Sequence, residues 1–199
     1  MASVISPSFR AILSTAIIVL AALFILAPRS AISAEYASAH YRDFPLVDQN
    51  GEAFSLSDFE HETVIVNFVF TGCRTYCPVQ AGALSTFYDD LKQRAPDTPF
   101  KIVSITLTPV FDGPREMRSY SEPFSKGRDN WMFATGKPGH IQDMLEQLEL
   151  EVFYGERPGI DVLHETDIFL LHPSSNRTER FEGVPLDHQG IRAAILATS

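Results

Sequence analysis

The two cysteines are the residues of this 199-residue chain best suited to chemistry, because they lie close together and the chain has no others. Three residues separate Cys73 from Cys77. Two neighbouring thiols can form a reversible disulfide, hold a soft metal ion such as Cu(I) or Zn²⁺, or do both. A purely structural disulfide is a further interpretation, but a bridge that closes so short a loop constrains little chain entropy.

The sequence on either side of the pair predicts where the thiols lie. Residues 63–70 form a nearly continuous run of β-branched and aromatic residues, which is typical of a strand buried on both faces. Thr71 and Gly72 end this run, and Pro78 suits the first residue of a helix over about 79–92. The thiols are therefore expected on a strand-to-helix turn, where the positive end of the helix dipole favours the thiolate.

The spacing of the thiols favours binding of one ion. With three intervening residues, rather than the two of thioredoxin-type reductases, both sulfurs can point the same way, like positions i and i+4 of a helix. Two thiolates leave the coordination incomplete, so a third ligand is expected, most simply a histidine. The residues alone do not single out one histidine. His164 and His172 are predicted in loops at the two ends of a strand over 166–171, where a lone histidine is more often solvated than bound to metal.

The remaining four histidines have simpler interpretations. His40 and His61 are predicted to be surface residues. His140 and His188 stand at expected helix starts, where local capping or solvation accounts for them.

The order of the other elements predicts the fold class. Asn50-Gly51 between apolar runs indicates an N-terminal β-hairpin. Further strands are expected over 100–107 and 131–134, and a hairpin is expected near the C-terminus. Helices that follow several of the strands are predicted at 114–125, around 141–148 and at 187–197. A strand that ends in two close cysteines before a helix is the thioredoxin-like arrangement. The prediction is an α/β, thioredoxin-like single domain with a central mixed sheet and a β-hairpin plus helix near the C-terminus.

Residues 1–34 are predicted to be a signal peptide or an N-terminal membrane anchor. Arg10 precedes an apolar stretch over 11–27, and small residues follow it. That stretch is long for a cleaved signal and short for a membrane helix, so both readings stay open. Either one places the domain over 35–199 in a bacterial periplasm, soluble after cleavage or anchored to the inner membrane through residues 11–27.

The charge of the chain argues against nucleic-acid partners. Residues 1–34 hold two of the 16 basic residues and no acidic one, so the rest has 14 basic and 25 acidic residues, a net charge of −11. Nucleic-acid binding needs a basic surface. A solvated acidic surface is the simplest reading of this charge.

The cysteine motif resembles the copper motif of the Sco (SenC/PrrC) family. Cys73-Arg74-Thr75-Tyr76-Cys77-Pro78 follows a strand and a threonine, as in that family's motif. Three further stretches match in the same order: residues 103–114, 131–136 and 162–173. The resemblance covers about residues 43–197. It implies a thioredoxin-like fold and copper, as Cu(I) or Cu(II), bound by Cys73, Cys77 and His164.

The chain departs from the family pattern at four positions in the matched stretches. Thr108 stands where the family usually has an aspartate. Leu163 and Glu165 replace the aspartate and serine around the ligand histidine, and His172 replaces an aspartate before Pro173. The three expected ligands are intact, so copper binding remains the prediction.

The resemblance implies a copper chaperone rather than an enzyme. Members of the family deliver copper to the dinuclear site of cytochrome c oxidase, or keep the cysteines of that site reduced. The expected partner is therefore the copper-site subunit of the oxidase or another copper or thiol protein. Oxidation of Cys73 and Cys77 to a disulfide would remove two ligands and release the ion. Tyr76, between the cysteines, is predicted to shield the metal or contact the partner.

Two enzyme classes compete with this prediction. An extracytoplasmic thiol-disulfide oxidoreductase would use Cys73 and Cys77 as its redox-active pair and would not need His164. A thiol peroxidase of the related fold would carry a threonine three residues before its reactive cysteine. Phe70 and Arg74 occupy those positions here, which argues against a peroxidase.

Overall fold

The computed structural model describes residues 40–125, 128–173 and 177–197, so the predicted signal or anchor over 1–34 lies outside these ranges. Within them, no helix combines the length and the apolar character needed to cross a membrane.

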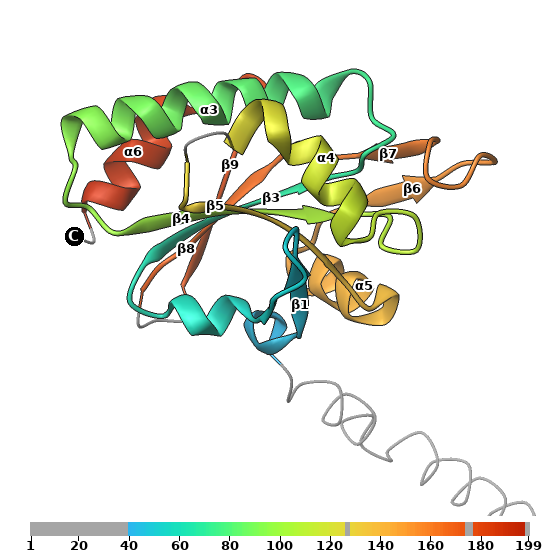
Figure 1. The fold of residues 1–199 in the computed structure, drawn as a ribbon. Coiled ribbons are helices and arrows are strands. Elements are labelled where there is room, and N and C mark those ends of the chain that lie inside the picture. Colours follow the sequence, from blue (N-terminus) through green and yellow to red (C-terminus); the bar gives the residue numbers. More distant parts are fainter. Residues whose placement is uncertain (1–39, 126–127, 174–176, 198–199) are drawn as a thin grey trace, which may run out of the picture. The chain divides into compact units, whose positions relative to one another are not determined.

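A seven-stranded mixed sheet lies at the centre of the domain, in the order β2-β1-β5-β4-β3-β8-β9 (Figure 1). Its middle strands β3, β4 and β5 are parallel, and the outer strands are antiparallel to their neighbours. The strands are β1 (Leu46–Asp48), β2 (Ala53–Phe54), β3 (Thr63–Val69), β4 (Phe100–Thr106), β5 (Trp131–Gly136), β8 (Ile168–Leu171) and β9 (Thr178–Phe181). The predicted central mixed sheet with a hairpin near each end of the chain is confirmed.

Helices cover both faces of this sheet. In Figure 1, α3 (Tyr76–Arg94), α4 (Pro114–Ser125) and α6 (His188–Leu196) lie on one face, and α5 (Pro138–Gln147) lies on the other. Two short 3-10 helices, Tyr41–Asp43 and Leu56–Phe59, precede β1 and β3. Every residue of β3 is buried, as expected for a central strand between two helical layers. β3 therefore has a fixed place, and so does the cysteine turn that follows it.

Helix α3 begins three residues earlier than the predicted start at Val79. It includes Cys77 and Pro78 in its first turn. Proline is tolerated there because the first N–H groups of a helix have no acceptor within the helix. Only the second cysteine is therefore helical: Cys73 lies in the predicted strand-to-helix turn, and Cys77 lies in the first turn of α3.

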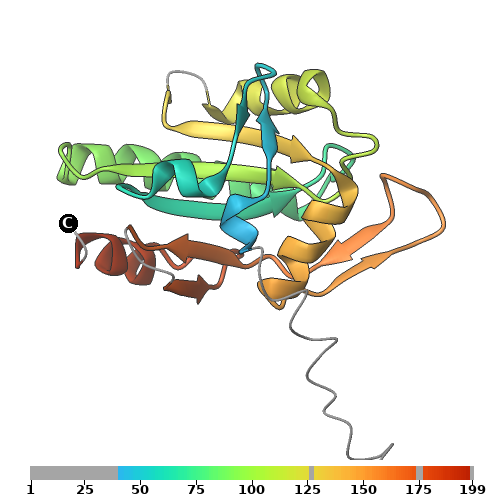
Figure 2. The same ribbon diagram turned by 90° about the horizontal axis from the view of Figure 1, so that it is seen from below.

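A second, two-stranded sheet was not predicted. Strands β6 (Val152–Tyr154) and β7 (Val162–His164) pair antiparallel and extend beyond the main sheet beside α5 (Figure 2). The prediction of a loop at His164 is wrong, because His164 is the last residue of β7. No side chain of these two strands is fully buried, and three residues are too few for alternation to be recognised, so the sequence held no clear strand signal here.

Candidate metal centre

The two thiols meet at the start of α3. The backbone N–H of Cys77 donates to Cys73 Sγ at 3.4 Å, so the first sulfur caps the first turn of the helix. The turn itself is closed by a hydrogen bond from Cys73 N to the Phe70 carbonyl, 3.1 Å long. Both cysteines are free thiols and both are buried, Cys73 with 8% and Cys77 with 2% of its surface exposed. Cys73 is therefore the more accessible of the pair.

The pair holds one proton rather than two. Hydrogen bonding to the Cys77 side chain lowers the pKa of Cys73 to about 5, helped by hydrogen bonds from the Thr75 and Cys77 backbone. The same contact raises the pKa of Cys77, and burial raises it further. Two thiols this close cannot both ionise readily. At neutral pH the site is thus a Cys73 thiolate beside a Cys77 thiol.

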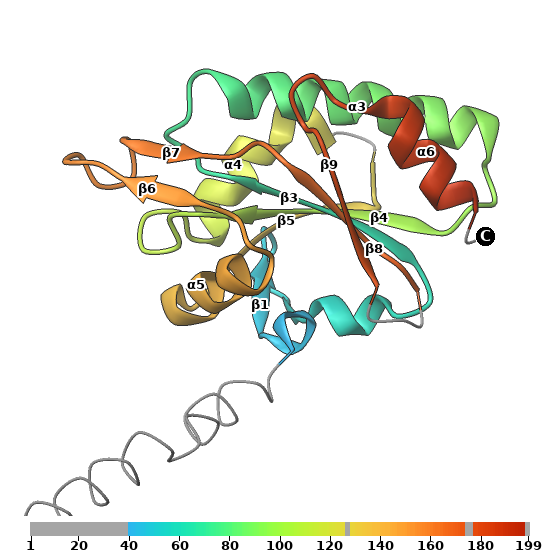
Figure 3. The same ribbon diagram turned by 180° about the vertical axis from the view of Figure 1, so that it is seen from behind.

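His164 reaches this pair from β7. Its Nε2 lies 4.0 Å from Cys77 Sγ, although 87 residues separate the two in sequence. Figure 3 shows the β3–α3 turn beside β7. His164 Nδ1 is 2.6 Å from the Glu165 carbonyl, which can only accept a hydrogen bond, so Nδ1 carries the proton. Burial lowers the pKa of His164, which favours the neutral ring. The Nε2 lone pair is therefore free on the side of the thiol.

The distance between these two groups suits a shared ion. Metal–sulfur and metal–imidazole bonds are about 2.3 and 2.1 Å long, so one ion can join two such atoms up to about 4.4 Å apart. Among the described residues, no three or more His, Cys, Asp or Glu side chains are packed closely enough to enclose an ion, at this site or at any other. The structure thus brings Cys77 and His164 within reach, with Cys73 beside Cys77, but the three are not yet closed around a centre.

Three contacts hold the β6–β7 hairpin against the cysteine turn. A Cβ atom on Gly72 would lie 2.2 Å from the Gly159 carbonyl oxygen, so this close approach requires glycine. A Cβ on Gly159 would in turn meet the Phe111 ring at 3.0 Å. The Tyr154 hydroxyl donates to the Leu107 carbonyl at the end of β4, at 3.1 Å. The hairpin that carries His164 is therefore fixed to the cysteine turn and to the end of β4 with the loop that follows it.

A buried carboxylate, that of Asp112, supports the turn that carries Cys73. Asp112 is 2% exposed and accepts hydrogen bonds from both the backbone N–H and the hydroxyl of Thr71, at 3.0 and 2.5 Å. It also accepts from the hydroxyls of Thr106 and Thr108, at 2.6 and 2.8 Å. Four donors satisfy the charge, and they tie the residue two before Cys73 to the end of β4. Sequence reasoning missed this role of Asp112.

Three of the four departures from the family pattern make structural contacts. Thr108 donates to Asp112 and so belongs to the network just described. Glu165 is held away from the site by Arg180 of β9, at 2.6 Å. His172 is buried and contacts Glu179, which makes it part of the β8–β9 hairpin. Leu163 is 69% exposed and has no packing role in the core.

A pocket of about 560 Å³ opens beside Cys73, between the start of α3 and helix α4. Tyr120 forms part of its wall, and its hydroxyl is buried without a hydrogen-bond partner among the described residues. Burial raises the pKa of Tyr120, and the negative charges of the thiol pair and of Asp112 raise it further. Tyr120 is thus a neutral donor near the thiols that the sequence alone did not reveal. Tyr76, by contrast, is 59% exposed, so it is available to a partner.

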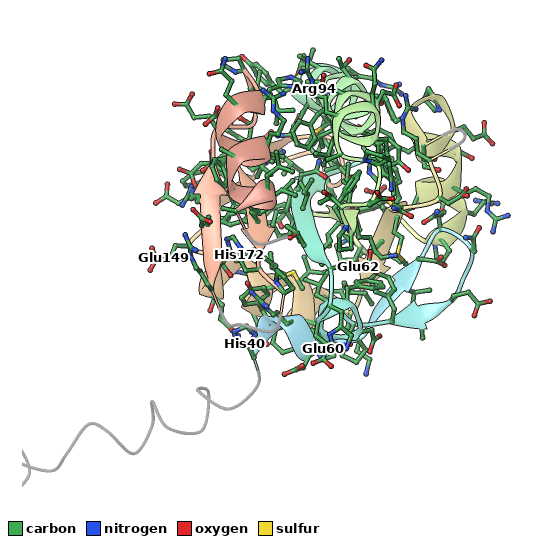
Figure 4. The ribbon with its side chains drawn as sticks, turned by 90° about the vertical axis from the view of Figure 1, so that its left-hand side faces the viewer. His40, Glu60, Glu62, Arg94, Glu149 and His172 are labelled. Carbon is green, nitrogen blue, oxygen red and sulfur yellow. The ribbon has the colours of Figure 1, made fainter. Side chains whose placement is uncertain are left out.

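His40 and His172 lie apart from the thiols. A second pocket, of about 550 Å³, lies near the start of β3, and its walls include His40, His172, Glu60 and Glu62 (Figure 4). The cysteines follow the opposite end of the same strand. Glu62 pairs with Lys101 at 3.8 Å. This pocket contains no thiol and none of the predicted ligands.

Comparison with known proteins relates the chain to one family. A family model described as SCO1/SenC matches residues 33–197. The SCO1 protein homolog of Bacillus subtilis is 28% identical over 145 residues, which cover 71% of this chain and 72% of the relative. The chain spans about half the length of other curated relatives that it matches, 55% and 53% in two cases.

Solved structures share the architecture. Arabidopsis thaliana ScoI with copper bound matches with a TM-score of 0.66 at 19% identity, over 78% of this chain and 94% of that one. BsSco is described as a member of the Sco family of cytochrome c oxidase assembly proteins that has a disulfide switch. It matches with a TM-score of 0.65 at 24% identity, over 78% and 90% of the two chains. At these identities the likeness concerns the fold, and the predicted thioredoxin-like fold is confirmed.

Proposed function

Because this chain belongs to the SCO1/SenC family, we propose that it is a copper chaperone that binds one ion through Cys73, Cys77 and His164. The observation that carries this proposal is the approach of His164 Nε2 to Cys77 Sγ, 4.0 Å away, from a strand 87 residues further along the chain. An imidazole with a free lone pair beside two thiols has little use in a purely structural disulfide. It is what a soft-metal site needs.

The donor set fits copper as a cargo. Two sulfurs and one imidazole suit Cu(I), and the same three groups can hold Cu(II) with a further position open to solvent or to a partner's ligand. Binding replaces the proton on Cys77, because only thiolates are strong ligands. The affinity for copper therefore falls as the pH falls, first through competition for Cys77 and then through protonation of Cys73.

The receiving protein in this proposal is the copper-site subunit of cytochrome c oxidase, or another copper or thiol protein. The exposed Tyr76 and the pocket beside Cys73 are where such a partner would approach. A direct test mixes the copper-loaded protein with a soluble fragment that contains the oxidase copper site and follows the absorbance of the assembled dinuclear centre. Wild type should transfer copper, and Cys73→Ser should not. A fragment that remains copper-free with wild-type donor would count against delivery.

A second candidate function is thiol-disulfide exchange, and the unequal thiols favour it. Cys73 has the lower pKa and the greater exposure, as expected of an attacking thiolate. It would attack a disulfide of a partner, form a mixed disulfide and release the partner's other sulfur. Cys77 would then lose its proton, attack the Cys73 sulfur and form the Cys73–Cys77 disulfide. Two electrons pass to the partner, which leaves reduced.

Replacing His164 separates the two functions. His164→Ala should weaken copper binding strongly, whereas the exchange reaction uses only the two sulfurs and should continue. Full copper delivery by His164→Ala would contradict the ligand set. Loss of thiol exchange in a folded His164→Ala protein would contradict a purely cysteine-based second function.

The location of the protein is also part of the proposal. Residues 1–34 act as a signal peptide or an inner-membrane anchor, and the domain from residue 35 works in the periplasm. Fractionation of cells that express the chain, with sequencing of the mature N-terminus, tests this. Recovery of the uncleaved protein from the cytoplasm would contradict it.

A further inference from the structure

A chain of five polar groups crosses the core and ends beside the candidate ligands. The Trp131 indole N–H donates to Ser104 Oγ at 3.0 Å, and the Ser104 hydroxyl donates to Asn67 Oδ1 at 2.7 Å. Asn67 Nδ2 donates to Gln80 Oε1 at 2.9 Å, and Gln80 Nε2 donates to the Thr166 carbonyl. The four side chains are almost completely buried, none with more than 2% of its surface exposed. Each donor in this series of hydrogen bonds therefore relies on the next group as its acceptor, because water does not reach it.

The two ends of the chain fix the orientation of every group in it. An indole N–H can only donate, and a backbone carbonyl can only accept. The hydroxyl and the two amides between them must all donate in the same direction. Hydrogen bonds aligned in this way polarise one another, and a buried break in the chain leaves unsatisfied groups on both sides. Gln80 thus has one favourable orientation, with its amide nitrogen toward Thr166.

Gln80 lies between the two elements that carry the ligands. It is three residues after Cys77 in α3, and Thr166 is two residues after His164. A Cβ atom on Gly183 would lie 1.7 Å from the Thr166 carbonyl oxygen and 2.2 Å from Gln80 Nε2. Glycine at position 183 therefore leaves room for this hydrogen bond and covers it closely.

The His164 strand needs such a link. Within the described part of the chain, β6 and β7 pair only with each other, so no ladder of the main sheet sets the height of His164 above Cys77. The contacts at Gly72 and Tyr154 fix the far part of the hairpin. Arg180 of β9 holds the Glu165 side chain, and the hydrogen bond from Gln80 joins the backbone of the segment after His164 to the helix that carries Cys77.

We infer that Gln80 is a positioning residue for the metal centre, which sets the separation of Cys77 and His164 through its bond to the Thr166 carbonyl. This inference rests on the proposed copper site. Gln80 itself touches no metal; it acts through the backbone on either side of the site.

The test compares Gln80→Met with Ser104→Ala in the full-length chain. Methionine keeps the length and apolar bulk of the side chain but loses both amide bonds. Ser104→Ala breaks the same chain of hydrogen bonds at the other end and leaves the bond to Thr166 intact, so it controls for core stability. A competition titration measures the Cu(I) affinity of the site. Amide hydrogen exchange over residues 162–168 of the metal-free protein measures how firmly Gln80 holds the segment after His164.

We expect Gln80→Met to weaken Cu(I) binding by about tenfold, the equivalent of one hydrogen bond of about 1.4 kcal/mol. Exchange over 162–168 should accelerate in Gln80→Met relative to Ser104→Ala. If Gln80→Met does not fold, Gln80→Leu serves instead, because leucine also removes both amide hydrogen bonds and is a strong helix former.

Equal effects of the Gln80 and Ser104 substitutions on both readouts would overturn the inference, as would wild-type affinity and exchange in the Gln80 variant. Failure of the proposed function looks different. In that case wild type itself does not bind one Cu(I), and the exchange measurement still reports whether Gln80 holds the segment after His164.

Discussion

Replacing Asp112 should destabilise the turn that carries Cys73. The Asp112 carboxylate is 2% exposed, and it accepts the N–H and hydroxyl of Thr71 and the hydroxyls of Thr106 and Thr108. Alanine would leave these donors without an acceptor in the core. The hydroxyls can turn toward one another, since those of Thr106 and Thr108 are 3.5 Å apart, but the Thr71 N–H is fixed.

The size of the effect follows from these contacts. An unsatisfied buried donor costs about 1–3 kcal/mol, and a hydrogen bond to a charged group contributes about 1.5–3 kcal/mol. With partial rearrangement of the hydroxyls, Asp112→Ala should lower the free energy of unfolding by about 3–4 kcal/mol. Asparagine keeps one oxygen for the three donors to Oδ2, and its amide can donate to Thr71 Oγ1. Asp112→Asn should therefore cost only about 1–1.5 kcal/mol.

Urea denaturation of the reduced, metal-free protein measures both values. Asp89→Ala is the matched control, because Asp89 accepts hydrogen bonds of 3.1 and 2.7 Å from Arg128 but its side chain is 61% exposed. An exposed ion pair contributes less than about 1 kcal/mol. If Asp112→Ala costs no more than Asp89→Ala, the buried network does not hold the cysteine turn and the reasoning fails.

Three further predictions concern the same region. Gly72→Ala should cost about 1–3 kcal/mol and weaken copper binding, because its Cβ would lie 2.2 Å from the Gly159 carbonyl oxygen. Gly82→Ala, whose Cβ meets nothing within 4 Å in the middle of α3, should instead stabilise by about 0.5–1 kcal/mol; equal urea midpoints for the two variants would contradict this. Tyr120→Phe removes a buried hydroxyl that has no hydrogen-bond partner among the described residues, so thermal unfolding should show unchanged or higher stability, and a large loss would reveal a partner for that hydroxyl. Alkylation of Cys73 by iodoacetamide should increase with pH around a midpoint near 5, because the thiolate reacts and its pKa is lowered. Cys77→Ala should move that midpoint up toward the ordinary range, and a wild-type midpoint above pH 8 would contradict the hydrogen-bonded pair.

The central elements could be predicted from sequence because their signals are local. The apolar run over 63–70 has the composition of a buried central strand, and it forms β3. Pro114 opens α4 as expected, and Asp187 caps α6 by accepting a hydrogen bond from Gly190 N. The turn at Asn50-Gly51 likewise joins β1 to β2, with Gly51 at φ +88°. In each case a few neighbouring residues decide the outcome.

The parts that position the site depend on contacts distant in sequence. The hairpin of β6 and β7 has little alternation of its own and is held by Gly72, Phe111 and Leu107, which no local pattern connects to it. The Gln80 contact with Thr166 joins residues 86 apart, and the carboxylate of Asp112 bonds to Thr71, 41 residues earlier. One local signal was present: Asn67 is a fully buried amide in an otherwise apolar stretch, and such a group requires a partner.

His164 could be predicted from a motif resemblance but not from the residue pattern alone. The residues alone gave no reason to choose it over His172, since both were predicted in loops. The resemblance to a known copper motif selected His164, and the structure brings its Nε2 within 4.0 Å of Cys77 Sγ. His172 is instead buried against Glu179.

The most direct test of the proposed metal centre is a Cu(I) competition titration of the reduced protein, with wild type beside Cys73→Ser, His164→Ala and His172→Ala. The proposal predicts tight one-to-one binding that Cys73→Ser abolishes, that His164→Ala weakens strongly and that His172→Ala leaves unchanged once the variant is shown to be folded. Wild-type affinity in His164→Ala, or weak binding by wild type itself, would contradict the three-ligand copper site.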